Sequence, residues 1–168
     1  MIQWIAAINS IKDKTGHVVN YDTFQNNTNP EYAKIYKLLT DSKVNLSAAE
    51  WINYYPGKDF DQSIVDEFAK IVGLTTLRAW ISKVRPGKFV PYHWDVDENE
   101  EEYLKLGTIR RFTCFMVESV PGQVIMIESE YLYNKPAGTI YEWPDYKAWH
   151  ASINGSLVPK YLFHFLGY

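Results

Sequence analysis

A dense series of strand-like segments after residue 74 is the feature that most constrains the fold of this chain. Each segment is rich in β-branched and aromatic residues and is bounded by turn-forming residues, which is typical of strands. The segments span 75–84, 87–95, 108–120, 123–133, 139–143, 148–153 and 159–167. This many short strands after a helical front section predict a mainly β protein with N-terminal helices. The expected core is a cupin-like double-stranded β-helix, or jelly roll, with helices packed on its major sheet.

Two helices of the front section carry clear boundary signals. Asn29 followed by Pro30 is an N-cap followed by proline at the first helical position, and apolar residues follow at helical spacing. Asp61 can cap another helix, whose apolar stripe runs over 64–72. Gly73 stands where a C-terminal cap is expected.

Other parts of the front section are less distinctive. Residues 4–8 fit either a strand or a short helix, and 18–21 is a possible edge strand. Ser47 and Glu50 form a capping box, which predicts a short helix through about Tyr54. The polar run 24–29 is expected to be a loop, and so is the acidic run 98–102. No repeat or linker interrupts the chain, so we expect a single domain over 1–168, with a helical section at 1–74 and the β core at 75–168.

Composition excludes several classes of function. The net charge of -3 and the pI near 5.8 give no general attraction to nucleic acid or to anionic membranes. The single cysteine, Cys114, rules out an internal disulfide and fits a reducing compartment. The first residues lack the basic region of a signal peptide, and no apolar run approaches the length of a membrane span. A soluble cytoplasmic protein is therefore expected.

The segment around His93 and Asp95 suggests a metal site. Alternate residues of a strand point to the same side, so this imidazole and this carboxylate can face a common point. A second imidazole would complete the two-histidine, one-carboxylate triad that holds non-haem Fe(II) and leaves one face open. The chain has four histidines, and His150 lies in another strand pattern. His93, Asp95 and His150 are therefore the candidate ligands.

Lys160 follows His150 at a spacing that could place the two side chains opposite each other in a hairpin. If a three-residue loop over 154–156 joins two hairpin strands, His150 lies directly across from Lys160. A two-residue loop would shift the register by one and turn the lysine to the other face. We expect the longer loop, with Gly155 or a neighbour in the left-handed conformation. An ammonium beside an iron site suits a dicarboxylate, which chelates the metal at one end and needs a cation at the other.

These residues resemble the Fe(II)/2-oxoglutarate-dependent oxygenases, and most closely their aspartyl/asparaginyl β-hydroxylase-like branch. The resemblance covers about 76–166 and rests on Pro86-Gly87, the run 91–95, the strand at 110–113, and 150–156 leading to Lys160. It implies Fe(II) held by His93, Asp95 and His150. It also implies 2-oxoglutarate as cosubstrate, gripped at its far carboxylate by Lys160 and contacted by Ser82 and Arg111. A hydroxylase acting on an amino-acid or peptidyl side chain is then expected.

The chain also departs from that branch. The branch usually has arginine at the place of Lys160 and a histidine at the place of Thr113, and some of its members lack the carboxylate that Asp95 provides. Arg110 and Arg111 point to opposite faces of a strand, and we expect Arg111 to face the pocket. Two alternatives stay open: a cupin-like metalloenzyme that does not use 2-oxoglutarate, and a non-catalytic jelly-roll binding module.

Overall fold

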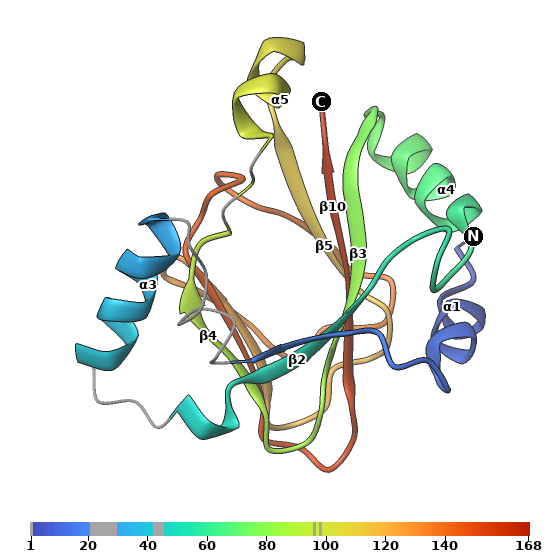
Figure 1. Ribbon diagram of the computed structural model, residues 1–168. Helices are drawn as coiled ribbons and strands as arrows, with labels where there is room; N and C mark the ends of the chain where they lie inside the picture. Colours follow the sequence, from blue (N-terminus) through green and yellow to red (C-terminus); the bar gives the residue numbers. More distant parts are fainter. Residues whose placement is uncertain (1, 21–29, 42–45, 96, 98) are drawn as a thin grey trace.

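The structure is a computed structural model that describes residues 2–20, 30–41, 46–95, 97 and 99–168 (Figure 1). Its helices are α1 (Trp4–Ile11), α3 (Pro30–Asp41), α4 (Gln62–Val72) and α5 (Glu100–Leu106), with a 3₁₀ turn, η1 (Leu46–Ala48). Its strands are β1 (His17–Asn20), β2 (Glu50–Tyr54), β3 (Thr76–Val84), β4 (Phe89–His93), β5 (Arg110–Phe115), β6 (Gln123–Ile127), β7 (Glu130–Leu132), β8 (Ile140–Glu142), β9 (His150–Asn154) and β10 (Lys160–Gly167). None of the described helices has the length and apolar character needed to span a membrane.

The strands form two antiparallel sheets. The major sheet has six strands in the order β1-β2-β3-β10-β5-β8, and the minor sheet has four in the order β4-β9-β6-β7. Residues of both sheets line one cavity, so the sheets face each other. The mainly β, cupin-like jelly roll predicted from the sequence is confirmed.

Helices cover the outer face of the major sheet. Side chains alternate along β10, so Leu162 and His164 face the cavity while Phe163 and Phe165 point outward. The outward rings pack against Phe68 of α4, with ring centroids 5.0 and 5.2 Å away. Figure 1 shows α1 and α4 on this side, as the sequence predicted, whereas α3 packs near β4.

The predicted caps of α4 are present. The Asp61 carboxylate accepts a hydrogen bond from the Ser63 backbone N–H at 2.8 Å. Gly73 ends the helix in the left-handed conformation, with φ of 70°. Residues 4–8, whose sequence fits either a strand or a short helix, belong to helix α1. The possible edge strand predicted at 18–21 is β1, at one end of the major sheet. The predicted loop 24–29 lies outside the described residues.

The predicted helix from Ser47 to Tyr54 is wrong. Only a 3₁₀ turn forms there, and Glu50–Tyr54 is strand β2, paired with β1 and β3. Both faces of β2 are buried, since Trp51 packs in one cluster while Ile52 and Tyr54 pack in another. Burial of both faces outweighs the local capping signal. The front section thus supplies two strands of the major sheet.

Two further predictions at turns are also wrong. The segment 123–133 is a hairpin rather than one strand, because Glu128, at φ of 52°, turns the chain between β6 and β7. The acidic run leads into helix α5 instead of a loop. Glu100 makes an ion pair with Lys147 at 2.5 Å and accepts a hydrogen bond from the Tyr146 hydroxyl, which ties α5 to the segment before β9.

The predicted hairpin between His150 and Lys160 does not exist. Strand β9 belongs to the minor sheet and β10 to the major sheet, so the chain between them crosses from one sheet to the other. His150 pairs with His93 and Ile127 instead, and Lys160 pairs with Val84. Neither Gly155 nor its described neighbours adopt positive φ.

Asn154 explains the crossing. Its amide donates hydrogen bonds to the backbone carbonyls of Val84 and Val158, at 2.8 and 2.9 Å. Its side-chain oxygen accepts hydrogen bonds from the backbone N–H and the hydroxyl of Ser156. These bonds fix the connecting loop between the sheets and prevent a tight turn.

Candidate metal centre and cavity

Three side chains converge at one end of the minor sheet. His93 at the end of β4 and His150 at the start of β9 are paired across the strands, with ring centroids 4.2 Å apart. Asp95 lies two residues beyond the end of β4. Its Oδ1 lies 3.4 Å from His93 Nε2, and its Oδ2 lies 3.8 Å from His150 Nε2. One potential ligand atom from each side chain lies within 4.8 Å of the other two. The structure therefore brings together the three residues predicted as ligands.

Backbone carbonyls orient both imidazoles. His93 Nδ1 lies 2.7 Å from the Pro91 carbonyl oxygen, and His150 Nδ1 lies 3.1 Å from that of Ala148. A carbonyl can only accept, so each Nδ1 carries the proton and each Nε2 presents a lone pair toward Asp95. This arrangement is typical of metal-binding histidines, whose second nitrogen is held by a hydrogen bond.

A buried arginine holds the carboxylate. Arg111 is 2% exposed, and its Nη2 lies 2.5 Å from Asp95 Oδ2. The guanidinium carbon lies 3.6 Å from the centre of the Trp143 ring and 5.5 Å from that of Trp80. Nη1 donates to the Tyr146 carbonyl at 3.3 Å. The guanidinium therefore has little freedom to move, and by holding Oδ2 it leaves Asp95 Oδ1 directed toward His93.

The charges favour metal binding. Burial opposes ionisation of Asp95, but the Arg111 guanidinium is the largest opposing influence, and the pKa of the carboxyl lies well below its usual value. Burial lowers the pKa of His150 well below its usual value. A carboxylate and a neutral imidazole are the forms that coordinate a metal ion.

The donor set fits a divalent ion. Metal–ligand bonds of about 2.0–2.2 Å at right angles place neighbouring ligand atoms roughly 3 Å apart, which is slightly closer than the distances here. Asp95 Oδ2 is buried without a hydrogen bond of good geometry in the described part of the chain. Two nitrogens and one oxygen on one side of a cavity are the donors expected for the ferrous facial triad.

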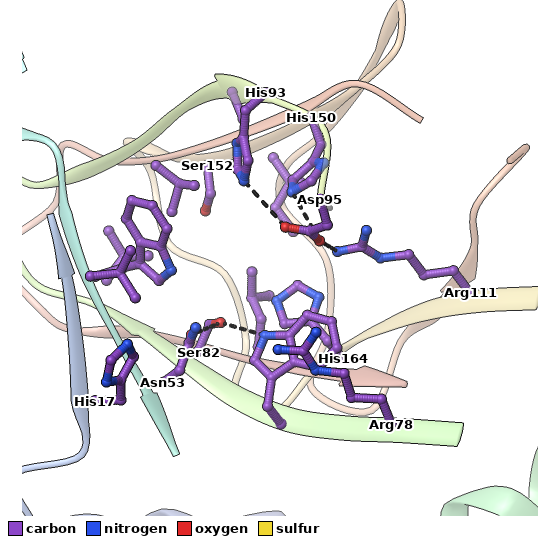
Figure 2. Close-up of a pocket in the computed structure, with 18 of the residues that line it drawn as sticks. His17, Asn53, Arg78, Ser82, His93, Asp95, Arg111, His150, Ser152 and His164 are labelled. Atoms are coloured by element: carbon purple, nitrogen blue, oxygen red, sulfur yellow. Dashed lines mark hydrogen bonds and ion pairs between the residues drawn. The ribbon is translucent and has the colours of Figure 1, made fainter. Parts of the chain in front are cut away.

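The cavity between the sheets has a volume of about 280 Å³, close to the lower limit of ordinary small-molecule sites, which is about 300 Å³. Figure 2 shows His93, His150 and Asp95 on one side and Ser82, Asn53 and His17 on the other. The second group comes from β3, β2 and β1, on which these residues pair in register. We call this side, together with Trp80 and His164, the major-sheet wall.

Ser82 and Arg111, both predicted to contact a cosubstrate, line the cavity. The Ser82 hydroxyl donates to Asn53 Oδ1 at 2.7 Å. Arg110 points to the opposite face, where it pairs with Glu142 at the surface.

Lys160 lies just behind the cavity lining. Its ammonium donates to the Val124 carbonyl at 2.6 Å and to Ser152 Oγ at 2.9 Å. The lysine is 2% exposed, and burial lowers its pKa to about 7. Ser152 lines the cavity and stands two residues after His150 on the same face of β9. The lysine is therefore buried inside the sandwich, at a position set by β10 and not by the predicted hairpin.

His17, Asn53 and Arg78 also line the cavity. Arg78 and Ser82 share a face of β3, so strand alternation could have indicated the arginine from the sequence. His17 and Asn53 carry no such signal, because the sequence did not identify β2 as a strand. His164, on the same face of β10 as Lys160, also lines the cavity.

No protein-family model and no curated protein matches this chain. Among solved structures it is similar to a putative sugar phosphate isomerase from Acidithiobacillus ferrooxidans, with TM-score 0.42 and 14% identity over 72% of this chain and 61% of that one. It is also similar to a predicted oxalate decarboxylase from Thermotoga maritima, with TM-score 0.44 and 9% identity over 71% of this chain and 81% of that one. A third similar structure is a cupin domain of an XRE-family transcriptional regulator from Enterobacter cloacae, with TM-score 0.43 and 12% identity over 70% of this chain and 96% of that one. The assignment of the fold rests on the pairing of the strands in two antiparallel sheets.

Proposed function

We propose that this protein is an Fe(II)- and 2-oxoglutarate-dependent oxygenase, a hydroxylase acting on an amino-acid or peptidyl side chain. The observation that carries the proposal is the convergence of His93, Asp95 and His150, with both Nε2 atoms directed at the carboxylate. Ferrous iron bound there would supply O2 activation coupled to oxidative decarboxylation of 2-oxoglutarate.

The surrounding residues have distinct tasks in this proposal. Arg111 fixes the orientation of Asp95, which keeps the three ligands on one face and leaves the cavity side open. Trp80 and Trp143 enclose the guanidinium and exclude water from it. The cavity, at about 280 Å³, is large enough for a small organic acid.

Lys160 supplies the positive charge for the far carboxylate. Residues two apart on a strand are about 6.6–6.8 Å apart, so Ser152 lies one such step from His150. A five-carbon dicarboxylate spans roughly this length. We propose that its far carboxylate binds at Ser152, with the charge of Lys160 directly behind.

Oxygen-dependent turnover tests the proposal. Protein loaded with Fe(II) should convert 2-oxoglutarate to succinate under O2, and Lys160→Ala should require a higher 2-oxoglutarate concentration for the same rate. Lys58→Ala, at an exposed lysine, is the matched control and should behave as wild type. Fe(II)-loaded protein that forms no succinate with any amino acid or peptide offered would contradict the proposal.

A second candidate is a cupin-like metalloenzyme that does not use 2-oxoglutarate. It is favoured by the position of Lys160, whose ammonium already has two protein partners and does not itself line the cavity. Iron binding without any effect of 2-oxoglutarate would support this candidate. Absence of iron binding would favour a non-catalytic binding module.

A further inference from the structure

Two hydrogen-bond chains on the major-sheet wall begin at tryptophan indoles. An indole N–H can only donate, so each chain has a fixed direction. Each passes through one hydroxyl and ends at a side chain that can present either a donor or an acceptor. The direction of the hydrogen-bond chain decides whether that last side chain presents its donor or its acceptor to the cavity.

The first chain ends at Asn53. The Trp80 indole donates to Ser82 Oγ at 3.1 Å, and the Ser82 hydroxyl donates in turn to Asn53 Oδ1 at 2.7 Å. The amide oxygen of Asn53 is therefore occupied. Its NH₂ group, for which the described residues provide no hydrogen-bond acceptor, is left for the cavity.

The second chain ends at His164. The Trp143 indole donates to Thr113 Oγ1 at 2.8 Å, and Thr113 Oγ1 lies 3.1 Å from His164 Nδ1. Thr113 is fully buried, and its hydroxyl proton has no other described acceptor, so it goes to Nδ1. Burial lowers the pKa of His164 to about 3, which keeps the ring neutral. Its single proton is then on Nε2, which has no described hydrogen-bond partner.

We propose that the major-sheet wall is a hydrogen-bond donor surface, on which Asn53 and His164 bind those carboxylate oxygens of a small organic acid that the metal and Ser152 leave free. The proposal rests on the proposed function in one respect, since it takes that acid to be 2-oxoglutarate. Neither residue was predicted to be a cosubstrate contact.

The direction of the two hydrogen-bond chains determines which chemical groups this wall can bind. A carboxylate has only acceptor oxygens, so each of its contacts with this wall is satisfied. An amide or ammonium group at the same place would face donors and leave buried N–H groups unpaired, which is costly. The wall therefore selects an acid over its amide.

The tautomer of His164 gives a test that needs no ligand. Long-range ¹H–¹⁵N spectra of ¹⁵N-histidine-labelled protein with diamagnetic Zn²⁺ added report which ring nitrogen carries the proton. We expect a neutral ring protonated at Nε2 from pH 6 to 8, with the signal assigned by its loss in His164→Phe. A ring protonated at Nδ1, or at both nitrogens, would overturn the proposal.

Binding of 2-oxoglutarate gives the second test. Asn53→Asp replaces the donor facing the cavity by a charged oxygen and should weaken binding about 100-fold, whereas His164→Phe keeps the ring and should weaken it about 10-fold. Asn9→Asp makes the same chemical change at an exposed position of α1 and should have no effect.

The outcomes separate the two proposals. Wild-type affinity in Asn53→Asp and His164→Phe would overturn the donor wall while leaving the oxygenase proposal in place. Failure of wild type to bind 2-oxoglutarate would count against the oxygenase, and the His164 tautomer would then decide on the donor wall by itself.

Discussion

His93 and His150 are directly paired residues of adjacent antiparallel strands, and their Nδ1 atoms both face backbone carbonyls. This pairing places two equivalent nitrogens on one side of a carboxylate without support from a loop. Sites built on strands hold their geometry better than sites on loops. The placement of the two imidazoles is thus a consequence of the register between β4 and β9.

Replacement of His150 tests the centre directly. His150→Ala removes one of three ligands, so we expect the variant to lose bound Fe(II), measured as iron per chain after gel filtration. His164→Ala, which removes another cavity-lining histidine, should retain the ion. Equal iron content in His150→Ala and wild type would count against the triad.

Replacement of Arg111 should lower stability and metal affinity together. Arg111→Ala leaves the Asp95 carboxylate without its buried partner, a change that costs about 3–5 kcal/mol when both groups are buried. We expect about 3 kcal/mol in urea unfolding, because the Asp95 side chain is 37% exposed. Arg110→Ala breaks a surface pair with Glu142 and should change little. Similar losses in the two variants would argue against a special role for Arg111.

Lys160 should make stability depend on pH. Its pKa is about 7 in the folded chain and near 10.5 when unfolded. Between these values the unfolded state binds more protons, so the free energy of unfolding rises with pH, by up to a few kcal/mol. Urea unfolding of the metal-free protein at pH 7 and pH 9 should show this rise, and Lys160→Met should lack it.

Lys58→Met, at an exposed lysine, should keep the rise with pH. An identical pH dependence in wild type and Lys160→Met would mean that the buried ammonium is not depressed in pKa.

The outer core should be separable from the metal centre. Phe68 is fully buried between α4 and the outer face of the major sheet. Phe68→Ala should cost about 3–5 kcal/mol, and Phe68→Leu considerably less. Iron stoichiometry in the folded Phe68→Leu variant should equal that of wild type. Loss of iron in that variant would show that the two faces of the major sheet are coupled.

Much of the fold was predictable because its signals are local. The strands after residue 74 and the caps of α4 depend on residue type and spacing within a few positions. Strand β2 was missed because its stability comes from partners on both sides, and the capping box at Ser47 gave a competing local signal.

The site was predictable for a different reason. His93 and Asp95 are neighbours in sequence, and only a few histidines remained to accompany them. The position of Lys160 could not be derived correctly, because a polar loop anchored by Asn154 looks like a tight turn in the sequence. Asn53 and His17 reach the cavity through strand pairing, which no local pattern indicates.

Anaerobic titration of the Fe(II)-loaded protein with 2-oxoglutarate tests the central claim most directly. We expect a visible chelate absorption band that saturates at one 2-oxoglutarate per iron and needs a higher concentration in Lys160→Ala. A protein that holds one Fe(II) per chain and develops no band at any concentration would contradict the account.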